Sequence, residues 1–491
     1  MERRRKMADY DHGIGVREQE TSLAVPMTGT AGLQVIFGTA PVNQALEPYK
    51  AANVPKLVYS FPEAVEAVGY CDDFKNYTLC SSIYANFKAF QIAPIILVNV
   101  LDPSNPEHVK DVEEKAYEIK SMQATIEEKG LLLDKVKVKN GSADLKRDKD
   151  YVLTFDDSGY VILTLMDESI KTVTVSGTAV NPEGVDYMDI IGGYDAVTGT
   201  EKGLELVRQI YPRFGMTPGL LIAPGWSKNI SVAAVMNAKC TEINGVFSCE
   251  CVVDLDSSGS GLEKYNECKT YKEKAGITGK HQIALWPEVT VGEYQMPYSA
   301  IYAAAVAYYD AENGDVPNLS PSNILAGVTG TVLEDGTEVI LDELQANFMN
   351  KNGIVTAIND LGYKIWGNNT ACYPANTDPK DRWICCRRFF SWWGNSFILS
   401  YKNKVDSPMN HVLIESICDT ENIRGNSLKD QGKCAGARIS YNASENTIAD
   451  ILNGRIRFHQ KLAPYTPAEY IENVLEFDPE LLQAALSGGE A

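Results

Sequence analysis

Short apolar runs along the chain alternate with segments of helical periodicity, and this pattern predicts an α/β core. An unbroken apolar run bounded by glycine or proline is typical of a buried strand, whereas apolar residues every three or four positions indicate a helix. The predicted strands lie at residues 33–42, 93–101, 218–225 and 281–289. The predicted helices lie at residues 61–70, 81–90, 201–215, 231–240 and 299–314. Another helix should begin after Asp342, because this N-cap residue is followed by Gln345 at the capping-box position and by Gly353 as a stop before a strand.

A second pattern, strict alternation of apolar and polar residues, fills the region from 102 to 183. Residues 133–145 contain Asn140-Gly141 between alternating positions, and residues 151–165 place a turn at 157–159 between two alternating runs. Such spacing predicts hairpins, and residues 171–177 add a further strand. Regularly spaced short strands favour a small β-sandwich inserted into the α/β core.

The two patterns divide the chain into an ordered series of parts. The ends differ from the middle, because residues 1–30 lack sustained periodicity, and the segment after Pro467 alternates and then ends in a short apolar tail. We expect an N-terminal arm at 1–30, a first part of the core at 31–101, the sandwich at 102–183, the rest of the core at 184–362, a C-terminal domain at 363–465 and a C-terminal arm at 466–491. The true start is either Met1 or Met7, because the first six residues read equally well as an upstream extension.

Composition narrows the class of partner. With 44% hydrophobic and 9% aromatic residues, the 491-residue chain is expected to fold into several domains. The formal net charge of −20 argues against nucleic acid as a direct partner, since phosphate binding needs a surplus of Lys and Arg. The apolar runs are too short to span a bilayer, and no apolar segment follows the basic N-terminus as it does in a secretory signal. We therefore expect synthesis in the cytoplasm and no stable membrane insertion.

Ser227 is the strongest candidate for a catalytic nucleophile. It follows a predicted strand and the turn Pro224-Gly225, and it precedes a predicted helix, as the nucleophile does in many hydrolases. Asn229, however, stands where that turn needs a small residue, and no histidine lies in a context typical of a general base. The preferred interpretation is that Ser227 caps the following helix. The histidines are His12, His108, His281, His411 and His459.

The other chemical motifs are weaker still. Cys240, Cys249, Cys251 and Cys268 lack the paired spacing of a zinc site, and we expect them on an exposed loop. Residues 254–267 are acidic and glycine-rich but lack the residue order of a calcium loop, and no glycine-rich phosphate motif is present. The aromatic group at 389–393 is either a ligand-stacking box or, as we prefer, core or subunit interface. We expect no enzyme activity, no catalytic residue, no metal and no cofactor.

Several stretches, taken in order, resemble one family. They are residues 13–42 (GIGVREQETSLAVPMTGTAGLQVIFGTAPV), 150–165 (DYVLTFDDSGYVILTL), 319–331 (LSPSNILAGVTGT), 341–358 (LDELQANFMNKNGIVTAI), 387–397 (RRFFSWWGNSF) and 445–478 (ENTIADILNGRIRFHQKLAPYTPAEYIENVLEFD). The family is the tail sheath proteins of contractile phages and related phage-tail-like particles. The resemblance covers essentially the whole chain, and the order of the stretches is more specific than any one of them.

The resemblance implies a structural role. The core would have a subtilisin-like α/β fold without protease activity, and the subunits would assemble as six-subunit rings stacked helically around an inner tube. Contraction would drive the tube through a cell envelope. The partners would be other copies of the chain, the inner tail tube protein, and the baseplate and tail terminator proteins. The protein would lie in the tail of the virion or contractile particle after assembly in the host cytoplasm.

The resemblance also implies which residues carry that role. The two arms would add strands to sheets of neighbouring subunits, and the C-terminal domain would face the tube. The arm candidates are Ile14, Val16, Leu23, Val25, Tyr470, Ile471, Val474, Leu475 and Phe477. The candidates for contact with the tube are Arg387, Arg388, Lys402 and Lys404, for which the alternative is an ordinary solvated charge. The alternative functions are a subtilisin-like serine hydrolase, the sheath of a bacteriocin or other non-phage injection system, and an adhesive surface protein built from the sandwich.

Overall fold

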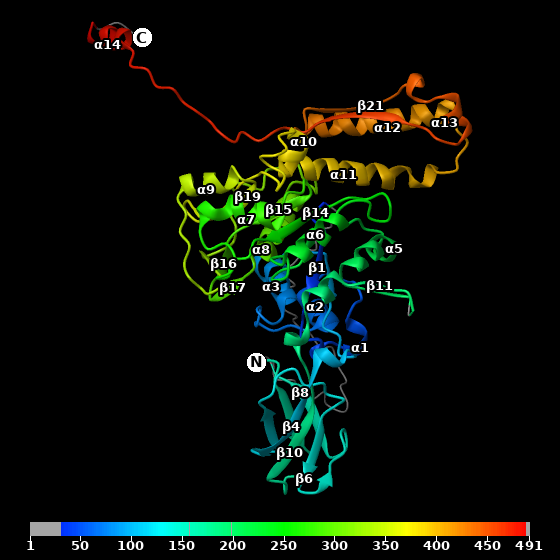
Figure 1. Cartoon of the computed structure of the whole chain (residues 1–491), viewed down its shortest axis with the longest axis vertical. Coiled ribbons are helices and arrows are strands. Elements are labelled where there is room, and N and C mark those ends of the chain that lie inside the picture. Colours follow the sequence, from blue (N-terminus) through cyan, green and yellow to red (C-terminus); the bar gives the residue numbers. More distant parts are fainter. Residues whose placement is uncertain (1–30, 157, 198, 488–491) are drawn as a thin grey trace, which may run out of the picture.

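The computed structural model describes residues 31–156, 158–197 and 199–487 of the chain. The N-terminal arm candidates Ile14, Val16, Leu23 and Val25 lie outside the described residues. Figure 1 shows three parts along the longest axis: a sandwich at one end, an α/β body in the middle, and a unit of two long helices at the other end. The C-terminal arm leaves from the boundary between the last two parts.

An eight-stranded mixed sheet forms the centre of the body, in the order β2-β3-β1-β13-β14-β15-β19-β20. The inner pairs are parallel, and β2 and β20 join the two edges in antiparallel orientation. Strands β1, β3, β13, β14 and β15 are buried along their whole length, as expected for a parallel sheet covered on both faces. The strands are β1 (Gln34–Gly38), β2 (Lys56–Val58), β3 (Ile95–Asn99), β13 (Leu220–Ile222), β14 (Glu250–Asp254), β15 (Gln282–Leu285), β19 (Ile354–Asn359) and β20 (Tyr363–Trp366).

Helices cover this sheet. The helix α8 (Tyr298–Glu312) is almost entirely buried, and its alanines allow close approach: a Cβ at Gly32 would lie only 2.9 Å from the Cα of Ala307. The helix α9 (Glu343–Asn350) begins at the predicted capping box, since Asp342 and Gln345 each bond the backbone of the other. The other helices of the body are α1 (Pro48–Ala51), α2 (Phe61–Val68), α3 (Thr78–Tyr84) with its π-helical continuation (Ala85–Phe90), α4 (Tyr187–Ile191), α5 (Ile210–Phe214), α6 (Ile230–Lys239) and α7 (Cys268–Ala275).

Smaller elements complete the body. Two short sheets lie beside the main one. The helix predicted at 201–215 is only partly α-helical, because residues 203–209 form a 3-10 helix and only α5 is an α-helix. The small sheets contain β11 (Gly193–Asp195) with β12 (Thr200–Lys202), and β17 (Tyr294–Met296) with β16 (Glu288–Val291) and β18 (Gly330–Val332). The remaining short 3-10 helices are Val42–Gln44, Pro106–His108, Pro182–Gly184 and Tyr265–Glu267.

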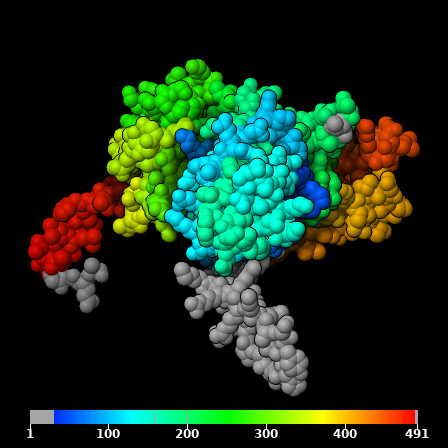
Figure 2. Space-filling view, turned by 90° about the horizontal axis from the view of Figure 1, so that it is seen from below, coloured from blue at the N-terminus to red at the C-terminus, as the bar shows by residue number. Residues whose placement is uncertain are grey.

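Residues 109–180 form a two-sheet lobe with a hydrophobic core of its own. Figure 2, seen from below, shows this lobe in cyan in front of the body. Both predicted hairpins are confirmed, because β6 pairs with β7 across Gly141, and β8 pairs with β9 around Gly159. The sheets are β4 (Val109–Glu118), β10 (Thr172–Val180), β6 (Lys137–Asn140) and β7 (Ala143–Asp144), and β5 (Gln123–Ile126), β9 (Val161–Leu165) and β8 (Tyr151–Phe155).

The C-terminal unit packs two long helices under a two-stranded hairpin. Helix α11 (Ile384–Tyr401) buries Phe389 and Trp393, and helix α12 (His411–Asp430) lies between it and the hairpin of β21 (Gly436–Tyr441) and β22 (Phe458–Ala463). Short helices complete the unit: α10 (Pro379–Arg382), the 3-10 turns Lys402–Lys404 and Ala443–Glu445, and α13 (Ile448–Leu452) at the turn of the hairpin. Helix α14 (Pro479–Leu486) ends the described chain, away from the body.

The four cysteines between 240 and 268 correct an expectation from the sequence. They are buried rather than exposed: Cys249 and Cys251 flank or lie in β14, Cys240 lies against both, and Cys268 begins α7. Within the described residues, no group of three or more metal-ligating side chains is placed to hold a metal ion. These thiols therefore belong to the hydrophobic core of the body.

Candidate functional site

Ser227 lies in a buried hydrogen-bond network, not at an exposed turn. Its Oγ donates to Oδ2 of Asp254 at 3.1 Å and accepts the Asp254 backbone N–H at 3.0 Å. Ser299 donates to the same carboxylate from its backbone at 2.8 Å and from its hydroxyl. Burial raises the pKa of Asp254 despite these three donors. The network joins β14 to the start of α8 and to the loop after β13, which is a structural task.

Within the described residues, no histidine lies beside Ser227 to act as a general base. The described histidines have other partners: Asp102 and Asp189 for His108, Cys249 and Glu250 for His281, Glu415 for His411 and Glu445 for His459. The expectation that Ser227 caps the next helix is also wrong, because Asn229 is the N-cap of α6 and accepts the Ser231 N–H at 2.9 Å. The side chain of Asn229, two residues closer to the helix, provides the N-cap that we expected from the Ser227 hydroxyl.

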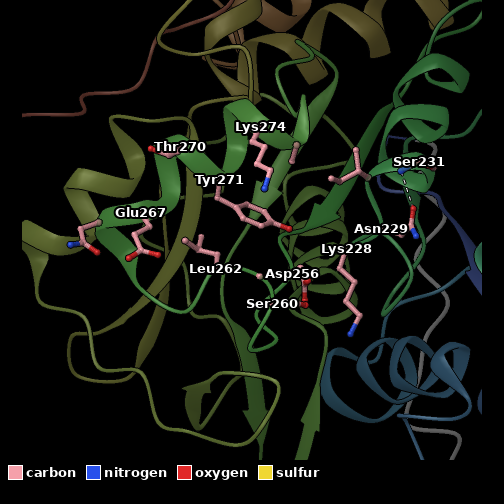
Figure 3. Close-up of a pocket in the computed structure, with 14 residues that line it drawn as sticks. Lys228, Asn229, Ser231, Asp256, Ser260, Leu262, Glu267, Thr270, Tyr271 and Lys274 are labelled. Carbon is pink, nitrogen blue, oxygen red and sulfur yellow. Dashed lines mark hydrogen bonds between the residues drawn. The ribbon is translucent and has the colours of Figure 1, made fainter.

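A cleft with a volume of about 770 Å³ opens beside this network (Figure 3). It lies where the loops after β13 and β14 meet α7, and Tyr271 points across it towards Asp256 (Figure 3). Lys228 on its rim is paired with Glu334 at 2.7 Å, and Lys274 is exposed. The side chains that line the cleft carry charges of both signs, but among them no nucleophile is hydrogen-bonded to a base. The cleft therefore does not indicate a particular reaction or ligand.

Two of the four tube-contact candidates are buried, which corrects the expectation for them. Arg387 donates to Asp381 at 3.0 Å, and Arg388 pairs with Asp310 of α8 and donates to the Ala31 carbonyl at 3.1 Å. Both arginines lie on the face of α11 that packs on the body, where a charged side chain is tolerated because it is paired. In the isolated chain, their charged groups therefore face partners inside the protein rather than solvent.

The other two candidates, Lys402 and Lys404, are exposed at the end of α11. The Lys402 ammonium lies 4.2 Å from the ring centre of Tyr211 in α5, so its side chain follows the surface of the body. Their contact with a tube stays a prediction. In the adjacent aromatic group, Phe389 and Trp393 are buried in the C-terminal core, which favours the packing interpretation over a ligand box.

The C-terminal arm is held at Glu469, where the body meets the C-terminal unit. Glu469 accepts from Arg382 at 2.7 Å and from the amide of Asn369 at 3.3 Å. The Arg382 guanidinium is itself held between the rings of Tyr373 and Trp383, at 4.2 and 3.9 Å from their centres. The arm therefore leaves the body from a defined place.

Beyond this anchor, the arm exposes large apolar side chains. Residues 470–478 form no strand within the described chain, so the strand predicted there is absent from the isolated chain. Five side chains are exposed to between 76% and 85%: Tyr470, Ile471, Val474, Leu475 and Phe477. Isolated exposed apolar residues are ordinary, but five within eight positions of an extended segment are typical of a surface that another chain covers.

The hairpin of the C-terminal unit has one blocked edge and one free edge. The Asn422 side chain of α12 bonds both the N–H and the C=O of Ile439 in β21, and the Tyr441 backbone bonds the Cys418 thiol. Because N–H and C=O of one residue point to the same side in an antiparallel pair, the groups of the facing residue Gln460 point away from β21. Within the part of the chain that the structure describes, the edge of β22 has no partner strand.

The free strand β22 also has a basic outer face. Phe458, Gln460 and Leu462 turn inwards over α12, whereas His459 and Lys461 point outwards, next to Arg438 of β21. Sequence reasoning found the arm but missed its anchor at Glu469 and this free edge. The alternation of residues 458–463 was the available signal for a strand; nothing in the sequence reveals that Asn422 blocks the other edge.

These features define a multidomain α/β protein whose candidate site is a surface for other protein chains rather than a pocket. None of the helices in the described residues has both the length and the apolar character needed to cross a membrane. No protein-family model matches the chain.

Individual relatives are more specific. The chain is 23% identical over 494 residues to the tail sheath protein of Burkholderia phage BcepMu, covering 98% of this chain and 99% of the relative. It is 26% identical over 287 residues to a putative prophage major tail sheath protein of Pseudomonas aeruginosa, covering 57% of this chain and 70% of the relative. The PVC sheath complex of an extracellular contractile injection system in the contracted state matches with a TM-score of 0.56 at 16% identity, covering 97% of this chain and all of that one. The resemblance to tail sheath proteins is thus confirmed, and the mixed α/β fold is that of a contractile sheath chain.

Proposed function

We propose that this chain is the subunit of a contractile sheath, which polymerises as six-subunit rings stacked helically around an inner tube. Contraction of the stack drives the tube through a cell envelope. The names of the sequence relatives support a sheath subunit. The observation that carries the assembly step is the anchored arm with its exposed apolar side chains, together with a hairpin that has one free edge.

The arm and the free edge match in pattern. As a strand, the arm would place Ile471, Leu475 and Phe477 on one face, and Glu472 and Glu476 on the other. Added to β22 of a neighbouring copy, the first face continues the inward apolar row of that strand. The second face sets two carboxylates beside the outward His459 and Lys461 of the neighbour. Strand addition of this kind gives affinity through the backbone and specificity through the side chains.

Such a joint also suits movement. A strand shared between subunits keeps them connected while each body rotates as a rigid unit about the arm. If contraction buries ~1,000 Å² of partly apolar surface per subunit, the gross gain is on the order of 10–25 kcal/mol before the costs of ordering and desolvation. Summed over many rings, this gain drives contraction without a nucleotide.

The finer features follow from the same proposal. The eight-stranded sheet is the subtilisin-like core of a sheath without hydrolase chemistry, and Lys402 and Lys404 lie on the side that meets the tube protein. The remaining partners are the baseplate and the tail terminator, and the location is the tail of a virion or contractile particle assembled in the host cytoplasm. Both phage tails and another injection system occur among the matches, and the neighbouring genes decide between them. The buried Ser227 weighs against the hydrolase.

The test is negative-stain electron microscopy of the purified chain over a concentration series. Wild-type protein should form hollow tubes or stacked rings of uniform diameter. Deletion of residues 470–491 or of residues 1–25 should leave a folded monomer that does not polymerise. Tubes of normal yield from either deletion would refute the role of that arm, and absence of ordered polymers with the wild type in the presence of its tube and baseplate proteins would refute the sheath.

A further inference from the structure

Helix α14 at the end of the arm has an apolar face without a partner. Leu481, Leu482 and Leu486 are exposed, and no residue of this eight-residue helix is buried. The arm and α14 are also acidic, since residues 469–480 contain five carboxylates and no basic side chain. A partner surface for α14 should therefore be apolar with basic residues nearby.

One surface of the C-terminal unit has this chemistry. The short helix α13, at the turn between β21 and β22, exposes Ile448, Ile451 and Leu452. Arg455 and Arg457, both exposed, follow it directly and lead into β22. This set, the α13 patch, combines three large aliphatic side chains with two guanidinium groups at the end of the free strand.

A second exposed apolar surface fits less well. Leu344 and Phe348 of α9 are exposed, with Ile340 next to them. The residues around this surface are acidic, since Glu338 and Asp342 precede α9 and Glu343 lies in its first turn. Like charges would repel the acidic arm there.

The length of the arm brings α14 to the α13 patch in one direction only. If the arm runs antiparallel to β22 with Ile471 opposite Leu462, then Leu475 faces Phe458 and Pro479 lies level with Gly454, just past α13. Residues 470–478 extend over about 30 Å, enough to cover the six residues of β22 and reach that turn. A parallel arm would instead bring α14 close to Ala463. The exposed large apolar residue near that position is Tyr465, in place of the three aliphatic side chains of the α13 patch.

We propose that α14 docks on the α13 patch of a neighbouring copy, with the arm running antiparallel along β22 of that copy. This inference rests on the proposed function and adds the direction of the strand and a second contact at its end. Each joint between subunits is then a strand followed by a helical latch. The latch secures the end of the arm against peeling from the neighbouring edge.

Crosslinking between two variants tests the contact. Chains with Leu452→Cys are mixed with chains carrying Leu482→Cys and treated with a short bis-maleimide, and wild-type chains report the background from the partly exposed Cys71 and Cys418. A covalent dimer should form only in the mixture and only at polymerising concentrations. Leu344→Cys replaces Leu452→Cys in a matched control, because its side chain belongs to the other apolar surface.

Truncation after residue 478 gives an independent readout. Since the arm strand remains, tubes should still form, but at a critical concentration about tenfold higher or more. The latch would be refuted if tubes crosslinked with the Leu344→Cys variant, or with neither variant. It would also be refuted if the truncation left the critical concentration unchanged. None of these results would contradict the proposed sheath function. Absence of tubes with every variant and the wild type, with tube and baseplate proteins present, would overturn both.

Discussion

The two faces of the arm give the sharpest test of how the subunits are joined. Leu475 and Val474 are neighbours, and both are exposed in the isolated chain, to 85% and 76%. Neither should contribute to folding of the monomer, so alanine at either position should leave its thermal unfolding unchanged. In a strand added to β22, however, Leu475 points inwards over α12, and Val474 points to the solvent side.

The expected difference follows from burial. Covering a leucine side chain contributes about 1.5–3 kcal/mol, and most of this is lost in Leu475→Ala. A loss of about 1.5–2.5 kcal/mol per joint raises the critical concentration for polymerisation roughly 10- to 60-fold. Val474→Ala stays on a solvated face and should shift it by no more than about 0.5 kcal/mol, or roughly two- to threefold.

Sedimentation of polymer over a concentration series measures both values, with electron microscopy to check that the pellet contains tubes. Ile471→Ala should behave like Leu475→Ala, because the two residues share a face. Equal effects of Leu475→Ala and Val474→Ala would mean that the arm does not bind as a strand. A larger effect of Val474→Ala would mean that the opposite face is buried, and the match with β22 would be wrong.

Three further predictions concern the body. Arg388→Met should destabilise the body by about 3–5 kcal/mol, because Asp310 is left buried without its partner. Adding Asp310→Leu to this variant should restore most of the lost stability. Urea unfolding measures both values, with the exposed Arg438→Ala as the control. Burial lowers the pKa of Lys272 from 10.5 to about 8, so between these pH values the unfolded chain binds more protons than the folded chain. The stability of the wild type relative to Lys272→Met should therefore rise with pH from about 8 to 10.5. A stability difference that stays constant over this range would refute the prediction. A fluorophosphonate probe should not label Ser227, and mass spectrometry of a labelled peptide would contradict this.

Much of the body could be predicted because local signals and burial agree there. The apolar runs at 33–42 and 93–101 contain β1 and β3, which lie side by side in the sheet. The capping box depends on two residues three positions apart, Asp342 and Gln345, and not on distant contacts, so the sequence alone predicts it. The expected exposed loop for Cys240, Cys249, Cys251 and Cys268 was wrong, because the tertiary structure places Cys251 in the buried strand β14 and Cys249 directly before it.

In the candidate site too, features set by neighbouring residues were predicted from the sequence, and features set by distant contacts were not. The alternation of the arm is local and was found, but the burial of Arg387 and Arg388 depends on Asp381 and Asp310, and the second of these lies 78 residues away. A pair of arginines beside aromatic residues reads equally well as a surface patch or as a buried ion-pair cluster. Likewise, Ser227 and Asn229 are both good N-cap residues, and only the backbone geometry decides which of them begins α6.

Charge links the site to assembly. A chain with a formal net charge of −20 must bring acidic bodies together when it polymerises, and uniform repulsion would oppose this. The arm concentrates acidic groups, at Glu472, Glu476 and Glu480, on a segment that extends away from its own body. In the proposed antiparallel register, the hairpin of the neighbour would place Lys461 opposite Glu472 and Arg457 opposite Glu476. Under the proposed function, this pairing offsets the repulsion between bodies at the joint itself. Because that joint would be a single strand outside the compact body, the bodies would separate or approach without breaking it.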